Sequence, residues 1–324
     1  MLTSDFDYEL PSELIASEPL PQRQDSRMMV VHRDSGEIEH RMFRELPAFV
    51  KAGDLWVFND TRVIPARFLF DQPRREILRL EELTPLHWRC MVKPGKKFFL
   101  GAKVRIGEAT GRVIDIEETG ERLIEWDRLV DMQAHGHLAL PHYMRREDRE
   151  DDRERYQTVY AKNDGSIAAP TAGLHFTPEV IASLPHAFVT LHVGVGTFQP
   201  VKAEHLEEHK MHSERYEISS QTAHAVAGAK RVVAVGTTAC RTLEASAREH
   251  GQVTAGAGST DIFIHPGCEF KVVQALLTNF HLPKSTLFML VSAFAGRELI
   301  LRAYAEAVRE RYRFFSYGDC MLLV

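Results

Sequence analysis

The amino-acid sequence predicts an α/β protein, with a mostly parallel sheet covered by helices and a small antiparallel β-barrel domain inserted into it. The first observation is that strand-like apolar runs alternate with helix-like segments through the second half of the chain, which favours a parallel sheet covered by helices. The second is that residues 68–140 contain short alternating polar and apolar runs separated by glycines, which indicate an antiparallel barrel or sandwich. We therefore expect an α/β catalytic domain from residues 1–67 and 141–324, and an inserted β-barrel domain from residues 68–140.

Individual elements of the α/β domain follow from local patterns. Thr177, Pro178 and Glu179 supply a hydroxyl N-cap, a first-turn proline and an early acid, which together predict a helix start. Gly251 is the left-handed cap expected after a helix that ends near residue 250, and Ser285 is the expected N-cap of an apolar helix reaching residue 295. The other expected elements are a short helix at 12–15, strands at 26–32, 53–58, 187–193, 231–235, 261–264 and 272–277, and an amphipathic helix at 298–313.

The composition is that of a soluble globular protein, with 44% hydrophobic and 26% charged residues in a chain of 324. A net charge of −5 argues against a general coat for nucleic acid, but it permits a local basic patch that docks one structured RNA. The four cysteines lie far apart without CxxC spacing, so reduced thiols in the cytosol fit best. Residues 1–10 show no signal peptide, and the longest apolar run, 286–296, is shorter than the ~20 residues that span a bilayer. We expect a cytoplasmic protein without a membrane segment.

Residues 168–217 combine histidines, carboxylates and a glycine-bracketed strand end, and we place the active site there. The carboxyl ends of strands, and the loops after them, are where open α/β sheets bind ligands. The segment Gly194-Val195-Gly196 lacks the third glycine and the following helix of a dinucleotide site, so we reject that interpretation. Its backbone N–H groups could still meet the polar end of another ligand.

Two other polar segments follow predicted strands, and each has a plain interpretation beside a functional one. Asn59, Asp60, Thr61 and Arg62 form either an Asx-type turn with a surface salt bridge or part of a ligand site, with equal weight. The pair Thr237-Thr238 precedes a helix, where an ordinary N-cap is favoured over an anion-binding site.

His209 and His212 are the best-spaced pair for a metal, but the spacing is weak evidence. They are three residues apart with Lys210 and Met211 between them, whereas zincin motifs place two histidines four apart around a glutamate. We expect no metal site. Residues 145–155 are eleven consecutive charged residues, five arginines and six acids, and a solvated helix or linker face is favoured over RNA contact.

Seven long segments occur in an order that covers nearly the whole chain: 58–67 (FNDTRVIPAR), 152–160 (DRERYQTVY), 169–177 (APTAGLHFT), 191–198 (LHVGVGTF), 208–214 (EHKMHSE), 278–286 (TNFHLPKST) and 311–319 (RYRFFSYGD). Together they resemble the S-adenosylmethionine:tRNA ribosyltransferase-isomerase family of queuosine biosynthesis. The resemblance also implies two domains, an α/β domain and a small β-barrel.

The resemblance implies that the ribosyl unit of S-adenosylmethionine moves onto 7-aminomethyl-7-deazaguanine at the wobble position of tRNA. The unit rearranges to give epoxyqueuosine, while adenine and methionine leave. S-adenosylmethionine is then a substrate, and neither a cofactor nor a metal is expected. Because the sulfonium acidifies the neighbouring ribose C5′ hydrogens, a histidine or carboxylate base near neutrality could start the reaction. The expected partners are S-adenosylmethionine and tRNA carrying the deazaguanine, and we expect a monomer.

The family motifs define the candidate site residues. The catalytic candidates are His175, His192, Asp60 and His212, and the sequence does not assign acid and base among them. The substrate-binding candidates are Asn59, Thr61, Arg62, Thr171, Gly173, Gly194, Gly196, Thr197, Thr237, Thr238, Asn279 and His281. Because the net charge is negative, we expect the tRNA-binding basic residues to gather on one face, and the candidates are Arg67, Arg145, Arg146 and Lys284.

Two rival classes of protein remain open at this point. A metal-dependent hydrolase would use His209 and His212 and would contain zinc. A tRNA-binding module without catalysis would leave the polar strand ends unexplained.

Overall fold

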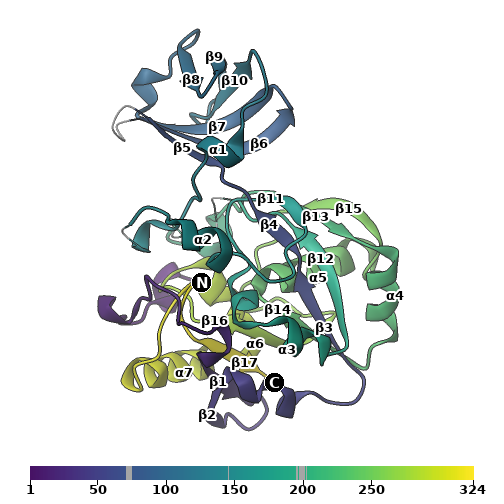
Figure 1. Ribbon diagram of the computed structural model, residues 1–324. Coiled ribbons are helices and arrows are strands. Elements are labelled where there is room, and N and C mark those ends of the chain that lie inside the picture. The colour runs from purple at the N-terminus through teal and green to yellow at the C-terminus, as the bar shows by residue number, and fades with distance from the viewer. Residues whose placement is uncertain (71–74, 145, 195, 197–200, 202) are drawn as a thin grey trace.

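The computed structural model describes residues 1–70, 75–144, 146–194, 196, 201 and 203–324. Figure 1 shows a large sheet with helices packed on it and a smaller sheet standing at one end. A parallel two-stranded pair, β4 (Thr61–Val63) with β11 (Asn163–Ser166), lies on the side of the large sheet that faces the smaller one.

Within the described residues, nine strands form the large sheet in the order β15-β13-β12-β3-β14-β16-β17-β1-β2. Their bounds are β1 Arg27–Val31, β2 Ile38–Met42, β3 Asp54–Asn59, β12 His186–Leu191, β13 Glu214–Ile218, β14 Arg231–Val235, β15 Gly256–Thr260, β16 Val273–Asn279 and β17 Cys320–Leu323. The neighbours β12–β3, β3–β14, β14–β16 and β17–β1 are parallel, and the other four neighbouring pairs are antiparallel. The sheet is mixed, so the prediction of a mostly parallel sheet is not confirmed.

The antiparallel pairs flank the four central parallel strands. Between β1 and β2 the chain turns through Gly36, whose φ of 73° is in the left-handed region. A connection this short cannot form the crossover that parallel pairing requires, so β2 folds back beside β1. The four central strands keep the expected arrangement, and their carboxyl ends therefore meet at one edge of the sheet.

The core lies on both faces of the large sheet, because its central strands are apolar on both sides. Side chains alternate in direction along a strand. Accordingly, Val57 packs with one buried cluster, whereas Trp56 and Phe58 pack with the cluster on the opposite face.

The helices are α1 Met132–His135, α2 Glu150–Arg155, α3 Pro178–Ala182, α4 Ser220–Gly228, α5 Thr237–His250, α6 Thr286–Ala295 and α7 Arg297–Arg309. Short 3-10 helices are η1 Thr3–Phe6, η2 Ser12–Leu14, η3 Arg23–Asp25, η4 Phe43–Phe49, η5 Gly95–Lys97, η6 His142–Met144, η7 Thr171–His175 and η9 Leu206–Glu208.

The predicted helix ends are confirmed at three places. Ser285 Oγ accepts a hydrogen bond from the backbone N–H of Phe288, 3.2 Å away, at the start of α6. Thr177 caps α3 in the same way, with proline in the first turn. Gly251 ends α5 with a φ of 78°. Each of these signals depends on a few adjacent residues, which explains why the sequence alone located them.

The predicted strand at 261–264 is wrong, because the chain pairs five residues earlier. Strand β15 (Gly256–Thr260) pairs with β13 along its whole length, and 261–264 are outside any strand. Gly258 lies directly against the ring of Tyr216, and a Cβ at this position would be 2.6 Å from Cζ of that ring. The absence of a side chain at Gly258 therefore lets this edge strand approach its partner.

Six strands form the smaller sheet within the described residues, in the order β5-β6-β7-β10-β9-β8, with every neighbouring pair antiparallel. The bounds are β5 Arg67–Phe70, β6 Arg75–Thr84, β7 His87–Lys93, β8 Lys103–Ile106, β9 Ala109–Ile116 and β10 Arg122–Trp126. Its interior contains Phe68, Trp88 and Trp126, so it is a barrel-like sheet with a core of its own. The antiparallel insertion is confirmed, whereas the domain boundaries at 67/68 and 140/141 stay a prediction.

None of the helices in the described part of the chain is both long enough and apolar enough to cross a membrane.

Candidate active site

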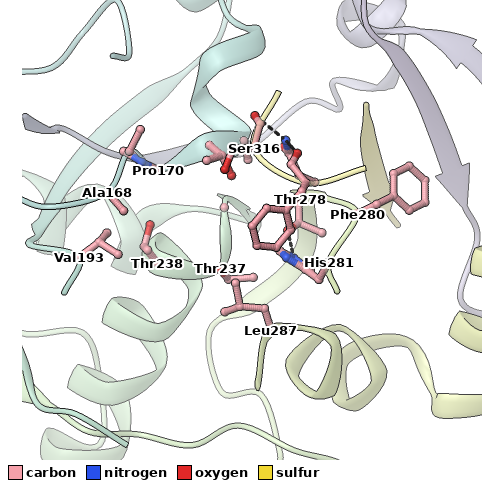
Figure 2. Close-up of a pocket in the computed structure, with 16 residues that line it drawn as sticks. Ala168, Pro170, Val193, Thr237, Thr238, Thr278, Phe280, His281, Leu287 and Ser316 are labelled. Carbon is pink, nitrogen blue, oxygen red and sulfur yellow. Dashed lines mark hydrogen bonds between the residues drawn. The ribbon is translucent and has the colours of Figure 1, made fainter. Parts of the chain in front are cut away.

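A pocket opens where the carboxyl ends of the central strands meet the loops that follow them. We call it the inner pocket; it has a volume of about 50 Å³. Figure 2 shows Ala168 and Pro170 on one side, Thr278 and His281 on the other, and Thr237 at the start of α5 between them. The remaining lining residues are Ala169, Thr171, Ala172, Val193, Gly236, Thr238, Asn279, Phe280, Leu287, Phe315 and Ser316. Of the predicted substrate-binding residues, Thr171, Thr237, Thr238, Asn279 and His281 all line this pocket.

His281 is a neutral member of the pocket wall. Its Nε2 lies 2.8 Å from the hydroxyl of Thr278, and its backbone N–H donates to the hydroxyl oxygen of Tyr304. Burial lowers the pKa of His281 to about 3, so its imidazole carries no charge near neutral pH. The wall of the inner pocket is thus built of hydroxyls, a neutral imidazole and apolar groups.

His175 lies behind the pocket and has a partner at each ring nitrogen. Nδ1 is 2.8 Å from Ser26 Oγ, and Nε2 is 3.0 Å from Oδ1 of Asn279. The amide group of Asn279 in turn donates to the carbonyl oxygens of Phe315, at 2.9 Å, and Ser316, at 3.3 Å. His175 therefore orients the Asn279 side chain and holds the 315–316 turn, rather than presenting a free nitrogen to a substrate.

Because His175 is buried, we expect the free energy of unfolding to depend on pH. Burial lowers the pKa of its imidazole from 6.5 to about 4. Between these two values the unfolded chain binds the extra proton, so the stabilisation that is present above pH 6.5 is lost as the pH falls toward 4, by about 3 kcal/mol at most. We expect His175→Gln to flatten the fall in the free energy of unfolding between pH 7 and 4.5, measured by urea denaturation. His224→Gln, at an exposed histidine, is the matched control, and equal pH dependence in all three proteins would contradict the expectation.

Residues 59–61, at the end of β3 and directly after it, are buried and join three elements. Asn59 Oδ1 accepts from the backbone N–H of Leu191 at 2.9 Å, and its amide donates to Thr238 Oγ1 at 3.1 Å. Asp60 Oδ1 accepts from the Thr190 hydroxyl at 2.6 Å and from the Asn163 amide at 3.1 Å. Asn59 thus ties β3 to β12 and to the start of α5, which a local Asx turn would not do. The plain interpretation is also met: the backbone N–H of Thr61 donates to Asn59 Oδ1 at 3.2 Å, as in an Asx-type turn, and Arg62 is half exposed and lies 3.4 Å from Asp164.

A second, larger cavity lies between the two sheets. We call it the outer cavity; its volume is about 350 Å³. Its lining residues from the inserted part of the chain are Leu80, Glu81, Arg89 and Glu121. Those from the rest of the chain are Gly165, on β11, and Ile167, His192, Val193, Gly194, His212, Ser213, Glu214 and Arg215. Val193 lines both hollows, so the inner pocket and the outer cavity adjoin at this side chain.

His192 is the catalytic candidate that faces the outer cavity. Its Nδ1 is 2.8 Å from Thr61 Oγ1, which fixes the ring, and no hydrogen bond to Nε2 occurs among the described residues. Burial lowers the pKa of His192, and the neighbouring Arg215 lowers it further. A neutral imidazole with one oriented nitrogen and one unengaged nitrogen is suited to accept a proton. Gly165 leaves room for the ring, because a Cβ there would lie 2.8 Å from Nδ1.

The glycine loop after β12 is held by a buried ion pair that the sequence did not reveal. The backbone N–H of Gly194 donates to Oε1 of Glu214 at 2.9 Å. The other oxygen of Glu214 accepts from the guanidinium of Arg241 on α5, and both side chains are about 5% exposed. Glu214 belongs to a recognised motif, whereas no local pattern singles out Arg241.

The other glycine candidates are explained by close packing. A Cβ on Gly173 would lie 2.0 Å from the hydroxyl of Tyr160, and one on Gly196 would lie 2.5 Å from Cδ2 of His212. Their absent side chains make room for neighbours, so neither position needs a substrate to account for it. Thr197 lies outside the described residues.

The predicted tRNA-binding cations are engaged by carboxylates wherever the structure describes them. Arg67 lies 2.9 Å from Glu76, and Lys284 lies 2.7 Å from Asp7. Arg146 is mostly buried and pairs through two nitrogens with Asp152, which is itself buried. Replacing Arg146 would therefore leave a buried carboxylate without its partner, and a variant at this position reports on folding as well as docking. Arg145 lies outside the described residues.

Among the described residues, no three His, Cys, Asp or Glu side chains lie close enough together to hold a metal ion. His212 lines the outer cavity, whereas the ring of His209 packs edge-on against Phe263.

The fold is that of an α/β protein with two adjoining hollows near the carboxyl ends of its central strands, which make the candidate ligand site. The chain matches the model of the queuosine biosynthesis protein family over residues 3–323, and it belongs to that family. Relatives named "S-adenosylmethionine:tRNA ribosyltransferase-isomerase" are 50% identical in Symbiobacterium thermophilum and 47% identical in Desulforamulus reducens, each over 100% of both chains. The solved structure of the S-adenosylmethionine tRNA ribosyltransferase of Thermotoga maritima is 39% identical, covers 99% of this chain and superposes with a TM-score of 0.58.

Proposed function

We propose that this protein transfers and isomerises the ribosyl moiety of S-adenosylmethionine onto 7-aminomethyl-7-deazaguanine at the tRNA wobble position. The products are epoxyqueuosine in tRNA, adenine and methionine. The full-length likeness to relatives that bear this activity in their names carries the proposal. The site supports it, because five of the seven motifs that resemble the family contribute lining residues to the inner pocket or the outer cavity.

The two adjoining hollows suit a reaction between two large substrates. A base that undergoes chemistry must leave its stack and enter a pocket. The outer cavity is the roomier hollow and opens between the two sheets, so we assign it to the modified base. The inner pocket, with its hydroxyls and apolar wall, then takes part of S-adenosylmethionine. Because Val193 borders both, the ribose of one substrate can lie beside the aminomethyl group of the other.

Within this arrangement we assign the general base to His192. Its lowered pKa keeps the imidazole neutral near pH 7, so Nε2 can accept a C5′ proton that the sulfonium has acidified. Thr61 holds the ring, and Asp60 supports the same strand end through Thr190 and Asn163. His212, also in the outer cavity, is our candidate for the second acid/base group, which the amine and the departing adenine require.

The proposed chemistry needs proton transfers and positioning, without a resident metal or cofactor, and we propose that the protein works as a monomer. Activity should therefore survive exhaustive treatment with EDTA. Loss of activity on chelation, with recovery on addition of zinc, would favour the metal-dependent hydrolase instead.

The activity is tested by adenine release from S-adenosylmethionine, followed by chromatography. Release should depend on tRNA that carries 7-aminomethyl-7-deazaguanine and should be absent with the same tRNA carrying guanine. Binding of both tRNAs without adenine release would identify a binding module rather than an enzyme.

A further inference from the structure

A third hollow lies on the other side of His175 from the inner pocket. We call it the arginine hollow; it is small, with a volume of about 20 Å³, and it is lined by Arg23, Arg155 and the turn at 316–318, among others. Ser316 lines both the arginine hollow and the inner pocket, so the two are separated by little more than the Asn279 and His175 pair. Arg23 was not a candidate in the sequence, and Arg155 belongs to the charged run 145–155, for which RNA contact was the less favoured interpretation.

Both guanidinium groups are held rigidly, and they are held by carbonyl oxygens. Arg23 donates to the carbonyl of Leu174 at 3.1 Å and to that of Glu154 at 2.9 Å. Arg155 donates to the carbonyls of Pro21, at 2.9 Å, and Leu20. A carbonyl orients a guanidinium without cancelling its charge. In addition, Nε of Arg155 is buried and has no hydrogen-bond partner among the described atoms, which is a costly state for a donor.

Two carboxylates close in sequence to the lining residues pair with other arginines, whereas Glu154 attracts Arg23 without forming an ion pair among the described residues. Glu18 pairs with Arg146 and with Arg149, at 3.2 Å in each case, and Asp152 pairs with Arg146. In the described part of the chain, neither Arg23 nor Arg155 has a carboxylate oxygen within ion-pair distance. The hollow therefore carries an excess of positive charge.

The electrostatics of neighbouring groups agree with this excess. Burial lowers the pKa of Arg23, the repulsion from Arg155 lowers it further, and the opposing attraction of Glu154 ranks below that repulsion. The pKa of His175, lowered first by burial, is also lowered by the charges of Arg23 and Arg313. A bound anion would relieve all of these unfavourable contacts at once.

We propose that the arginine hollow binds a backbone phosphate of the tRNA substrate through Arg23 and Arg155. The inference rests on the proposed function for the identity of the RNA. Guanidinium groups in a fixed orientation suit the bidentate recognition of phosphate oxygens. The described tRNA-binding candidates Arg67, Arg146 and Lys284, and the substrate-binding candidate Arg62, already face carboxylates. Because those cations are already paired, we place the tRNA-docking surface on the face that carries η3, α2 and the 316–318 turn, next to the inner pocket.

The test measures tRNA binding over a range of salt concentrations. We expect Arg23→Gln and Arg155→Gln each to reduce the slope of log K against log[salt] by about one unit and to weaken binding of modified and unmodified tRNA alike. Arg153→Gln is the matched control, because Arg153 lies on the same helix and also donates to carbonyls, those of Gln133 and Gly136, but does not line the hollow. The control should keep the wild-type slope.

Two further measurements separate the possible outcomes. Arg23→Lys and Arg155→Lys keep the charge and should keep most of the slope, which distinguishes phosphate contact from damage to the fold; thermal unfolding monitors folding of every variant. If the glutamine variants instead raised the Michaelis constant for S-adenosylmethionine and left the salt slope unchanged, the anion would be the methionine carboxylate and the proposal would be overturned. Failure of the proposed function would appear separately, as no adenine release by the wild-type protein.

Discussion

His192→Ala is expected to lower the rate of adenine release by about 10² to 10⁴, the usual cost of removing a general acid or base. The imidazole faces the outer cavity with Nε2 unengaged among the described residues, and Thr61 fixes the opposite nitrogen. Because the pKa of His192 is lowered, the acid limb of the wild-type pH–rate profile should lie below the ordinary imidazole value. That limb should vanish in the variant.

The control for this variant is His224→Ala, which removes an exposed imidazole outside both hollows. Thr61→Ala should give a smaller loss than His192→Ala, because it frees the ring without removing it. The variants and the wild-type protein are compared by their steady-state rates of adenine release at saturating tRNA and S-adenosylmethionine. A rate near that of the wild-type protein for His192→Ala would move the base to another group, with His212 the next candidate.

Arg241→Met is expected to lower the free energy of unfolding by about 3–5 kcal/mol, because it leaves the buried Glu214 carboxylate without its counter-charge. The same change should loosen the Gly194 loop, whose backbone N–H is held by Glu214. Urea denaturation gives the stability, and the rate of adenine release by the folded fraction gives the effect on the loop.

A double variant makes this prediction specific to the ion pair. Adding Glu214→Gln to Arg241→Met removes the orphaned charge while keeping an oxygen that can accept from Gly194, so it should recover part of the lost stability. Arg248→Met, on the same helix but donating to the carbonyl of Glu269 near the surface, should change stability little. If Arg248→Met and Arg241→Met cost the same, the buried pair would not be the source of the effect.

Much of the local structure could be predicted from the sequence because its causes are local. The caps at Thr177, Gly251 and Ser285 act on backbone groups within a few residues, and the buried strand at Arg231–Val235 is a continuous apolar run. The alternation of polar and apolar residues predicted the antiparallel strands of the inserted sheet. The resemblance, carried by long motifs, also named the family to which the chain belongs.

The directions of the strands and the placement of β15 could not be predicted in the same way. Pairing between β13 and β15 depends on Tyr216 lying over Gly258, two residues brought together only by the fold. A pattern that reads glycine as a poor strand former cannot anticipate such a cross-strand contact. The sheet also contains three further antiparallel pairs, β1–β2, β12–β13 and β16–β17, beside its four parallel ones.

The sequence by itself determined which residue types follow the predicted strands, and its long motifs carried the resemblance to the family and to its chemistry. Only the tertiary structure decided which of them are free to act: it surrounds His175 with two partners, leaves Nε2 of His192 facing a cavity, and pairs Arg146 with Asp152. The physical reason is that burial and charge balance depend on groups distant in the chain. Arg155, for example, reaches a carbonyl 134 residues away. Its guanidinium donates to carbonyl oxygens and forms no ion pair among the described residues, and no window along the sequence contains that information.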